Sequence, residues 1–139
     1  MSGEFWQHDI LIVDDNKAFR TYLRTILEKK LKLSVHEASD PREAFDFLKT
    51  KIPSLIVLDM EMPYMDGLTA LRILRQEPLT KNIPVVACTV LTNKELIVEL
   101  AELHITDYIL KDNTPDNILK KFEKIISSLP DKDVSFKML

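Results

Sequence analysis

Residues 55–67 read LIVLDMEMPYMDG, an apolar run followed by an acidic residue and a short loop. The four aliphatic residues have the length and composition of a strand buried on both faces of a parallel sheet. Asp59 closes this run, and the loop that follows ends in Asp66 and Gly67. The stretch therefore predicts a buried strand with a carboxylate at its carboxyl end.

Three further apolar runs end in residues that can handle phosphate or a metal ion. They are residues 10–13 before Asp14 and Asp15, residues 85–88 before Thr89, and residues 108–110 before Lys111. In an open α/β sheet, ligands bind at the carboxyl ends of the strands, where the strand order reverses. We therefore expect these residues to form one site with Asp59.

Short β-like runs alternate with amphipathic helical segments five times along the chain. We expect strands near residues 9–14, 33–38, 54–59, 83–89 and 106–110. Apolar residues recur at helical spacing between them, most completely over residues 118–129. Short βα units imply right-handed crossovers and a parallel sheet. The fold prediction is an α/β, flavodoxin-like (βα)5 open parallel sheet, strand order 2-1-3-4-5, with helices on both faces.

Capping residues mark three of the expected helix starts. The predicted caps are Asp40 before Pro41, Thr92 three residues before Glu95, and Thr114 before Pro115. We assign residues 8–129 to one domain, residues 1–7 to an N-terminal tail and residues 130–139 to a C-terminal tail or linker stub.

The composition is that of an ordinary globular domain, with 139 residues, 45% hydrophobic and 29% charged. A net charge of -3 argues against a nucleic-acid-binding surface, which is normally basic. Cys88 is the single cysteine and lies in an apolar run, so we expect a buried, inert thiol in a reducing compartment. With no membrane span or secretory signal in the sequence, a cytoplasmic location is expected.

Three carboxylates at one edge of a sheet raise each other's pKa unless a cation lies among them. Oxygen ligands alone favour a hard ion, and partly hydrated Mg²⁺ is the natural candidate. Mg²⁺ beside Lys111 would neutralise the oxygens of a phosphoryl group. Without a glycine-rich phosphate loop, a P-loop nucleotide site is not expected. We expect a covalent phosphoryl group on Asp59, with Asp14 and Asp15 holding the metal.

These motifs resemble the receiver domain of two-component response regulators, of the chemotaxis-type single-domain kind. The resemblance covers roughly residues 8–128 and rests on motifs in a fixed order. They are Asp14-Asp15, Asp59 with Met62-Pro63 and Asp66-Gly67, then Thr89, Tyr108 and Lys111.

The resemblance implies a phosphorelay protein in which Asp59 takes a phosphoryl group from a sensor histidine kinase or a histidine phosphotransfer protein. Asp15, Asp59 and the backbone carbonyl of Glu61 would bind Mg²⁺, with Asp14 helping through water. Lys111 would pair with the phosphoryl oxygens. Thr89 and Tyr108 would form the switch that alters a surface of the fourth helix, fifth strand and fifth helix. The resemblance also implies a downstream protein target or output domain, and leaves a homodimer open.

Three positions depart from the pattern usual in that family. Asp112 replaces a proline after Lys111, so we expect a trans bond and a different loop before Thr114. Val90 replaces a small residue and is expected to narrow access to Asp59. His104-Ile105 replaces Gly-Ala, which predicts an altered turn into the fifth strand.

The leading hypothesis is a signalling module and not an enzyme, acting without direct binding to nucleic acid or membrane. Three alternatives stay open: a phosphate-independent receiver that only binds proteins, an aspartyl-phosphate phosphatase of the haloacid dehalogenase type, and a flavodoxin-like redox protein. The phosphatase lacks support because Glu61, and not aspartate, stands two residues after Asp59. The chain is either a stand-alone receiver, which we favour, or one cut from a longer regulator.

Overall fold

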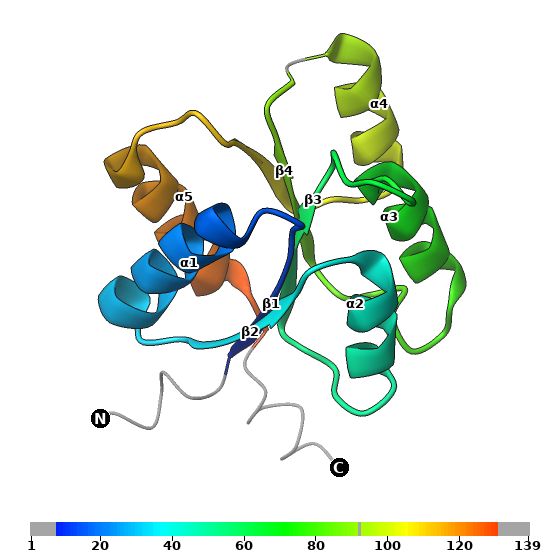
Figure 1. The fold of residues 1–139 in the computed structure, drawn as a ribbon, viewed down its shortest axis with the longest axis horizontal. Helices are drawn as coiled ribbons and strands as arrows, with labels where there is room; N and C mark the ends of the chain where they lie inside the picture. The colour runs from blue at the N-terminus through cyan, green and yellow to red at the C-terminus, as the bar shows by residue number, and fades with distance from the viewer. Residues whose placement is uncertain (1–7, 92, 131–139) are drawn as a thin grey trace.

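The computed structural model describes residues 8–91 and 93–130 of the chain. Five parallel strands form one sheet in the order β2-β1-β3-β4-β5, as predicted (Figure 1). The strands are β1 (Asp9–Val13), β2 (Ser34–Ala38), β3 (Leu55–Asp59), β4 (Val85–Thr89) and β5 (Asp107–Leu110). Each lies within a predicted strand and is shorter by one or two residues.

Helices cover both faces of the sheet, again as predicted (Figure 1). They are α1 (Lys17–Thr25), α2 (Pro41–Leu48), α3 (Gly67–Gln76), α4 (Lys94–Glu102) and α5 (Pro115–Ser128). Helices α1 and α5 lie on one face, and α2, α3 and α4 lie on the other. A π-helical turn, η2 (Ile26–Lys30), extends α1, which the sequence did not predict.

Alternation along the strands divides the core between the two faces. Ile10 and Ile12 pack with Phe122 of α5, whereas Leu11 and Val13 pack with Leu71 of α3. All of them are at most 1% exposed. A strand with two buried faces has no polar side, which is why the runs in the sequence are continuous and not alternating.

Two of the predicted helix caps are confirmed and the third is wrong. Asp40 and Thr114 accept hydrogen bonds from the backbone of α2 and α5. At α4 the cap is Asn93, whose side chain accepts from the amides of Glu95 and Leu96. Thr92 lies outside the described residues, as do the predicted N-terminal tail at 1–7 and all but residue 130 of the predicted C-terminal tail at 130–139.

The turn into β5 contains a non-glycine residue in the left-handed region. His104 has φ 58°, a left-handed conformation that normally favours glycine. Its amide donates to the carbonyl of Ala101, and the amide of Ile105 donates to that of Leu100, which closes α4 in a Schellman motif. The alteration of this turn relative to the family stays a prediction.

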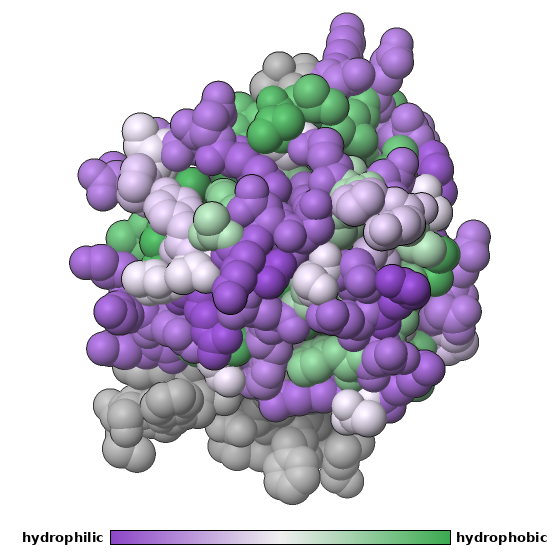
Figure 2. Space-filling model, viewed as in Figure 1, coloured by the Kyte–Doolittle hydropathy of each residue, from purple (hydrophilic) through white to green (hydrophobic). Residues whose placement is uncertain are grey.

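The surface viewed in Figure 2 is mostly hydrophilic, with hydrophobic side chains gathered near the start of α4. Val90, Leu91 and Val98 are the exposed apolar residues of this segment. Within the described part of the chain, no helix is long and apolar enough to cross a membrane.

Candidate functional site

The sheet order places the predicted residues at one edge. β3 is paired with β1 on one side and β4 on the other, with Asp59 opposite Cys88. Asp14 therefore follows the strand beside β3, and Thr89 ends the other neighbour. Lys111 follows β5, and its amide donates to the carbonyl of Thr89 at 2.9 Å. The carboxyl ends of four strands thus converge, as the sequence predicted.

Three carboxylates meet at this edge. One oxygen each from Asp14, Asp15 and Asp59 lies within 4.8 Å of the other two. Asp14 and Asp59 are only 1% exposed, whereas Asp15 is exposed. Oxygen Oδ2 of Asp59 is buried and has no hydrogen-bond partner. A buried, unpaired carboxylate oxygen beside two more carboxylates suits a hard divalent cation, so this donor set fits Mg²⁺.

Lys111 supplies a positive charge next to the carboxylates of Asp14 and Asp59. Its Nζ lies 2.8 Å from Oδ2 of Asp14 and 3.2 Å from Oδ1 of Asp59. The ammonium also lies 4.8 Å from the centre of the Phe19 ring, a cation–π contact from α1. The lysine is therefore fixed between two carboxylates and an aromatic face.

Burial dominates the electrostatics of Asp59. It raises the pKa of this carboxyl to about 7, against the hydrogen bond from the amide of Glu61 and with the help of the charge on Asp14. Burial alone would lower the pKa of Lys111, but the hydrogen bond to Asp14 and the charge of Asp59 raise it above its ordinary value. Lys111 therefore stays charged at neutral pH, whereas the pKa of Asp59 itself lies near neutral pH.

Short-range contacts hold the loop after β1 in place. Oδ1 of Asp14 accepts from the amide of Asn16 at 2.8 Å, and the Asn16 side chain caps α1. Arg20 donates to the carbonyl of Asp14 and pairs with Glu37 on β2 at 2.8 Å. The acidic pair is thus positioned by helix α1 and by the neighbouring strand.

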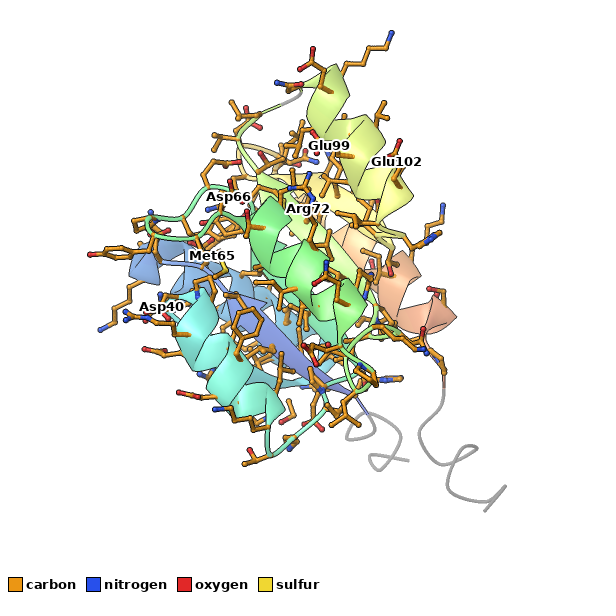
Figure 3. The ribbon with its side chains drawn as sticks, turned by 90° about the vertical axis from the view of Figure 1, so that its right-hand side faces the viewer. Asp40, Met65, Asp66, Arg72, Glu99 and Glu102 are labelled. Carbon is orange, nitrogen blue, oxygen red and sulfur yellow. The ribbon has the colours of Figure 1, made fainter. Side chains whose placement is uncertain are left out.

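The loop from β3 to α3 is built on Asp66 and Gly67. Asp66 caps α3 through the amide of Thr69, and Figure 3 shows it at the start of that helix. A Cβ atom at Gly67 would lie 2.2 Å from the carbonyl oxygen of Asp59. Only glycine allows this approach, so the Asp-Gly motif fixes the backbone next to the phosphoacceptor candidate.

Glu61 takes part in the site through its side chain, and the sequence did not predict its contact with Thr89. Its Oε2 accepts from Oγ1 of Thr89 at 2.7 Å, and its Oε1 accepts from the amide of Val90 at 3.1 Å. Thr89 is 2% exposed, so this carboxylate satisfies a buried hydroxyl. Twenty-eight residues separate Glu61 from Thr89, and no periodic pattern connects them.

Tyr108 is half-buried on β5. Nζ of Lys121 lies 5.0 Å from the centre of its ring and donates to its carbonyl at 2.9 Å. This places Tyr108 on the strand beside Thr89, while a movement of its ring stays a prediction.

The peptide bond after Lys111 is trans, as expected from Asp112 in place of proline. The described residues contain no cis peptide bond, which confirms the trans expectation at Asp112. The ion pairs of Lys111 go to Asp14 and Asp59, and Asp112 is exposed. The effect of Val90 on access to Asp59 stays a prediction.

Comparison with known proteins gives a consistent result. The chain matches the family described as the response regulator receiver domain over residues 10–123. It is 29% identical to the chemotaxis protein CheY of Bacillus subtilis over 120 residues, which are 86% of this chain and 98% of that protein. A protein-glutamate methylesterase/protein-glutamine glutaminase of Rhodopseudomonas palustris is 42% identical over 106 residues, 73% of this chain but only 28% of that longer one.

A solved structure agrees with the sequence comparison. The phosphorylated cyanobacterial phytochrome response regulator RcpA superposes with a TM-score of 0.79 at 29% identity, covering 90% of this chain and 99% of RcpA. Relatives of this fold therefore occur both as chains of similar length and as parts of longer proteins.

Proposed function

Because the chain belongs to the response regulator receiver domain family, we propose that Asp59 accepts a phosphoryl group and thereby switches a protein-interaction surface. The observation that carries the proposal is the convergence of Asp14, Asp15 and Lys111 on Asp59. One structurally similar protein, RcpA, is described as phosphorylated.

The carboxylate of Asp59 is the nucleophile in this proposal. An oxygen of Asp59 attacks the phosphorus of a phosphohistidine on the donor protein, a P–O bond forms, and the P–N bond to the imidazole breaks. Mg²⁺ held by Asp14, Asp15, Asp59 and the backbone carbonyl of Glu61 would neutralise the phosphoryl oxygens when bound. Lys111 pairs with the same oxygens and orients them, since it already lies 3.2 Å from Asp59.

The switch would consist of Thr89 and Tyr108. The hydroxyl of Thr89 donates to a phosphoryl oxygen, and Tyr108 on the adjacent strand turns inward into the vacated space. The altered surface would comprise α4, β5 and α5, where Val98 is an exposed apolar residue. The partners we propose are a sensor histidine kinase or histidine phosphotransfer protein upstream, and a protein target or output domain downstream.

Intact mass after incubation with acetyl phosphate and Mg²⁺ tests this function. We expect a gain of one phosphoryl group in the native chain, no gain when EDTA is present, and no gain in Asp59→Asn. Asp46→Asn, which removes an exposed carboxylate on α2, is the matched control and should gain the group normally. A phosphoryl group retained by Asp59→Asn would contradict the assignment. A native chain that neither gains the group nor binds beryllofluoride would favour the phosphate-independent receiver.

A further inference from the structure

The single proton of the Thr89 hydroxyl is already used in a hydrogen bond. It donates its proton to Oε2 of Glu61 at 2.7 Å and accepts from the amide of Leu91 at 2.9 Å. A hydroxyl has one proton to donate. Thr89 therefore cannot donate to any other oxygen while Glu61 holds it.

The amide of Val90 is occupied by the same carboxylate. This amide is the first after β4, and it donates to Oε1 of Glu61 at 3.1 Å. Both oxygens of Glu61 thus accept from donors at the end of the strand that pairs with β3 at Asp59. An anionic group with two oxygens is held here by one hydroxyl and one amide, which is the kind of contact that a phosphoryl group makes.

We propose that Glu61 is an internal substitute for the phosphoryl group: its carboxylate occupies the donors of Thr89 and Val90 until phosphorylation of Asp59 displaces it. This inference rests on the proposed function and specifies how the same site is regulated. Two anionic groups cannot share one hydroxyl proton. The like charges of the Glu61 carboxylate and a phosphoryl group would also repel each other if both lay beside Thr89. Glu61 therefore competes with the phosphoryl group for binding to the switch.

The displaced side chain has room to move. Glu61 lines an open groove of about 560 Å³ between the β3–α3 loop and α4, together with Met62, Leu91 and Leu96. Glu61 is itself only partly buried, so its carboxylate can reach water when it releases Thr89. Exchange between the two positions needs a rotation of the side chain and no change of the sheet.

The contact itself is tested first, in the metal-free and phosphate-free chain. We expect Glu61→Ala to move the Val90 amide proton upfield in ¹H–¹⁵N spectra and to speed its hydrogen exchange. The matched control is Glu95→Gln, which removes a negative charge at the exposed start of α4. The capping bond at this position runs from the backbone amide of Glu95 to the Asn93 side chain, so the substitution keeps it. A Val90 amide unchanged in Glu61→Ala would overturn the proposal.

The competition is tested by titrating beryllofluoride, a phosphoryl analogue, at saturating Mg²⁺ and following the amide resonances. Glu61→Ala should bind it about tenfold more tightly than the native chain, the factor for loss of about one charge-assisted hydrogen bond. Glu61→Gln should lie between them, and Glu95→Gln should match the native chain. If Glu61 only stabilised the loop, its removal would leave the affinity unchanged or weaker, which would overturn the proposal.

Failure of the competition by Glu61 and failure of the proposed function give different results in this titration. Tight binding by the native chain with no gain in Glu61→Ala would contradict the competition alone and leave the proposed function standing. Failure of the native chain and of all three variants to bind beryllofluoride would overturn the proposed function, and with it the competition.

Discussion

At the scale of single residues, Asp59 combines burial with an uncompensated oxygen. Its Oδ1 has an amide and the Lys111 ammonium, but its Oδ2 has no hydrogen-bond partner. A folded protein stabilises the protonated form of such a carboxyl relative to the unfolded chain, so its stability depends on pH. The site is therefore built at some cost to the stability of the metal-free fold.

The first prediction concerns Asp59→Asn in EDTA. The pKa of Asp59 is about 7 in the folded protein against 3.8 as the ordinary value, so the folded state binds the extra proton between these limits. The native chain should lose stability as pH rises from 4 to 7. The variant has no carboxyl at this position, so it should not show this part of the pH dependence. At pH 8 the variant should be more stable by about 2–4 kcal/mol, as measured by urea unfolding. Asp46→Asn, an exposed control, should follow the native pH profile.

The second prediction concerns Gly67→Ala. The new Cβ would lie 2.2 Å from the carbonyl oxygen of Asp59 and 2.7 Å from Cα of Met60, and neither backbone atom can move cheaply. We expect a loss of about 3 kcal/mol in urea unfolding together with a slower gain of the phosphoryl group. Thr69→Ala, at an exposed position in the same helical turn, should cost less than 1 kcal/mol. Equal losses in the two variants would contradict the close approach.

At the scale of helices and strands, the sequence predicted what repeats and missed what depends on a single side chain. The strands themselves followed from continuous apolar runs such as residues 55–58, since burial on both faces removes polar positions. The π-helical turn Ile26–Lys30 was missed because its apolar residues keep a helical spacing. The cap at Asn93 was missed because Thr92 and Glu95 have the spacing of a capping box, although asparagine is the more favourable N-cap residue.

In the candidate site, too, the residues at strand ends were predicted and a contact made by a single side chain was missed. Residues at strand ends, such as Asp14 and Lys111, were predictable because the fold brings carboxyl ends together. The contact of Glu61 with Thr89 was not predictable, since it joins a loop to a strand 28 residues away through one rotamer. A glutamate in an exposed loop carries no signal of this kind in a single sequence.

The third prediction compares two arginines on α3. Arg75 donates to the carbonyls of Lys81, Ile83 and Leu103, so it ties the end of α3 to the turn before β5. Burial lowers its pKa, and no carboxylate pairs with it among the described residues. Arg75→Ala should cost about 2–3 kcal/mol of stability, because several carbonyls, two of them partly buried, lose a charged donor.

The matched control for Arg75 is Arg72, one turn earlier on the same helix. Arg72 pairs with Glu99 of α4 at the surface, and Figure 3 shows the two side chains between the helices. Exposed ion pairs contribute roughly 0–1 kcal/mol, so Arg72→Ala should change thermal unfolding little. A cost for Arg72→Ala equal to that of Arg75→Ala would contradict the role given to Arg75.

At the scale of the whole molecule, the central position of β3 links the site to global stability. Asp59 ends a strand whose residues are all buried and which pairs with both β1 and β4. Repulsion among Asp14, Asp15 and Asp59 therefore acts on the centre of the sheet and not on a loop at its margin. A cation that relieves this repulsion should stabilise the entire fold, since it binds only where the ends of β1 and β3 are brought together.

The fourth prediction is that stabilisation by Mg²⁺ depends on pH. Mg²⁺ needs ionised carboxylates, and the pKa of Asp59 is about 7 without metal, so protons compete with the ion at pH 5 but not at pH 8. At ten times its dissociation constant, Mg²⁺ should add about 1.4 kcal/mol and raise the midpoint of thermal unfolding by roughly 3–5 °C at pH 8. The shift should be much smaller at pH 5, in Asp59→Asn, and in NaCl of equal ionic strength. An equal shift in NaCl would mean that Mg²⁺ only screens the net charge, because a bound ion depends on the geometry of the three carboxylates and a screening ion does not.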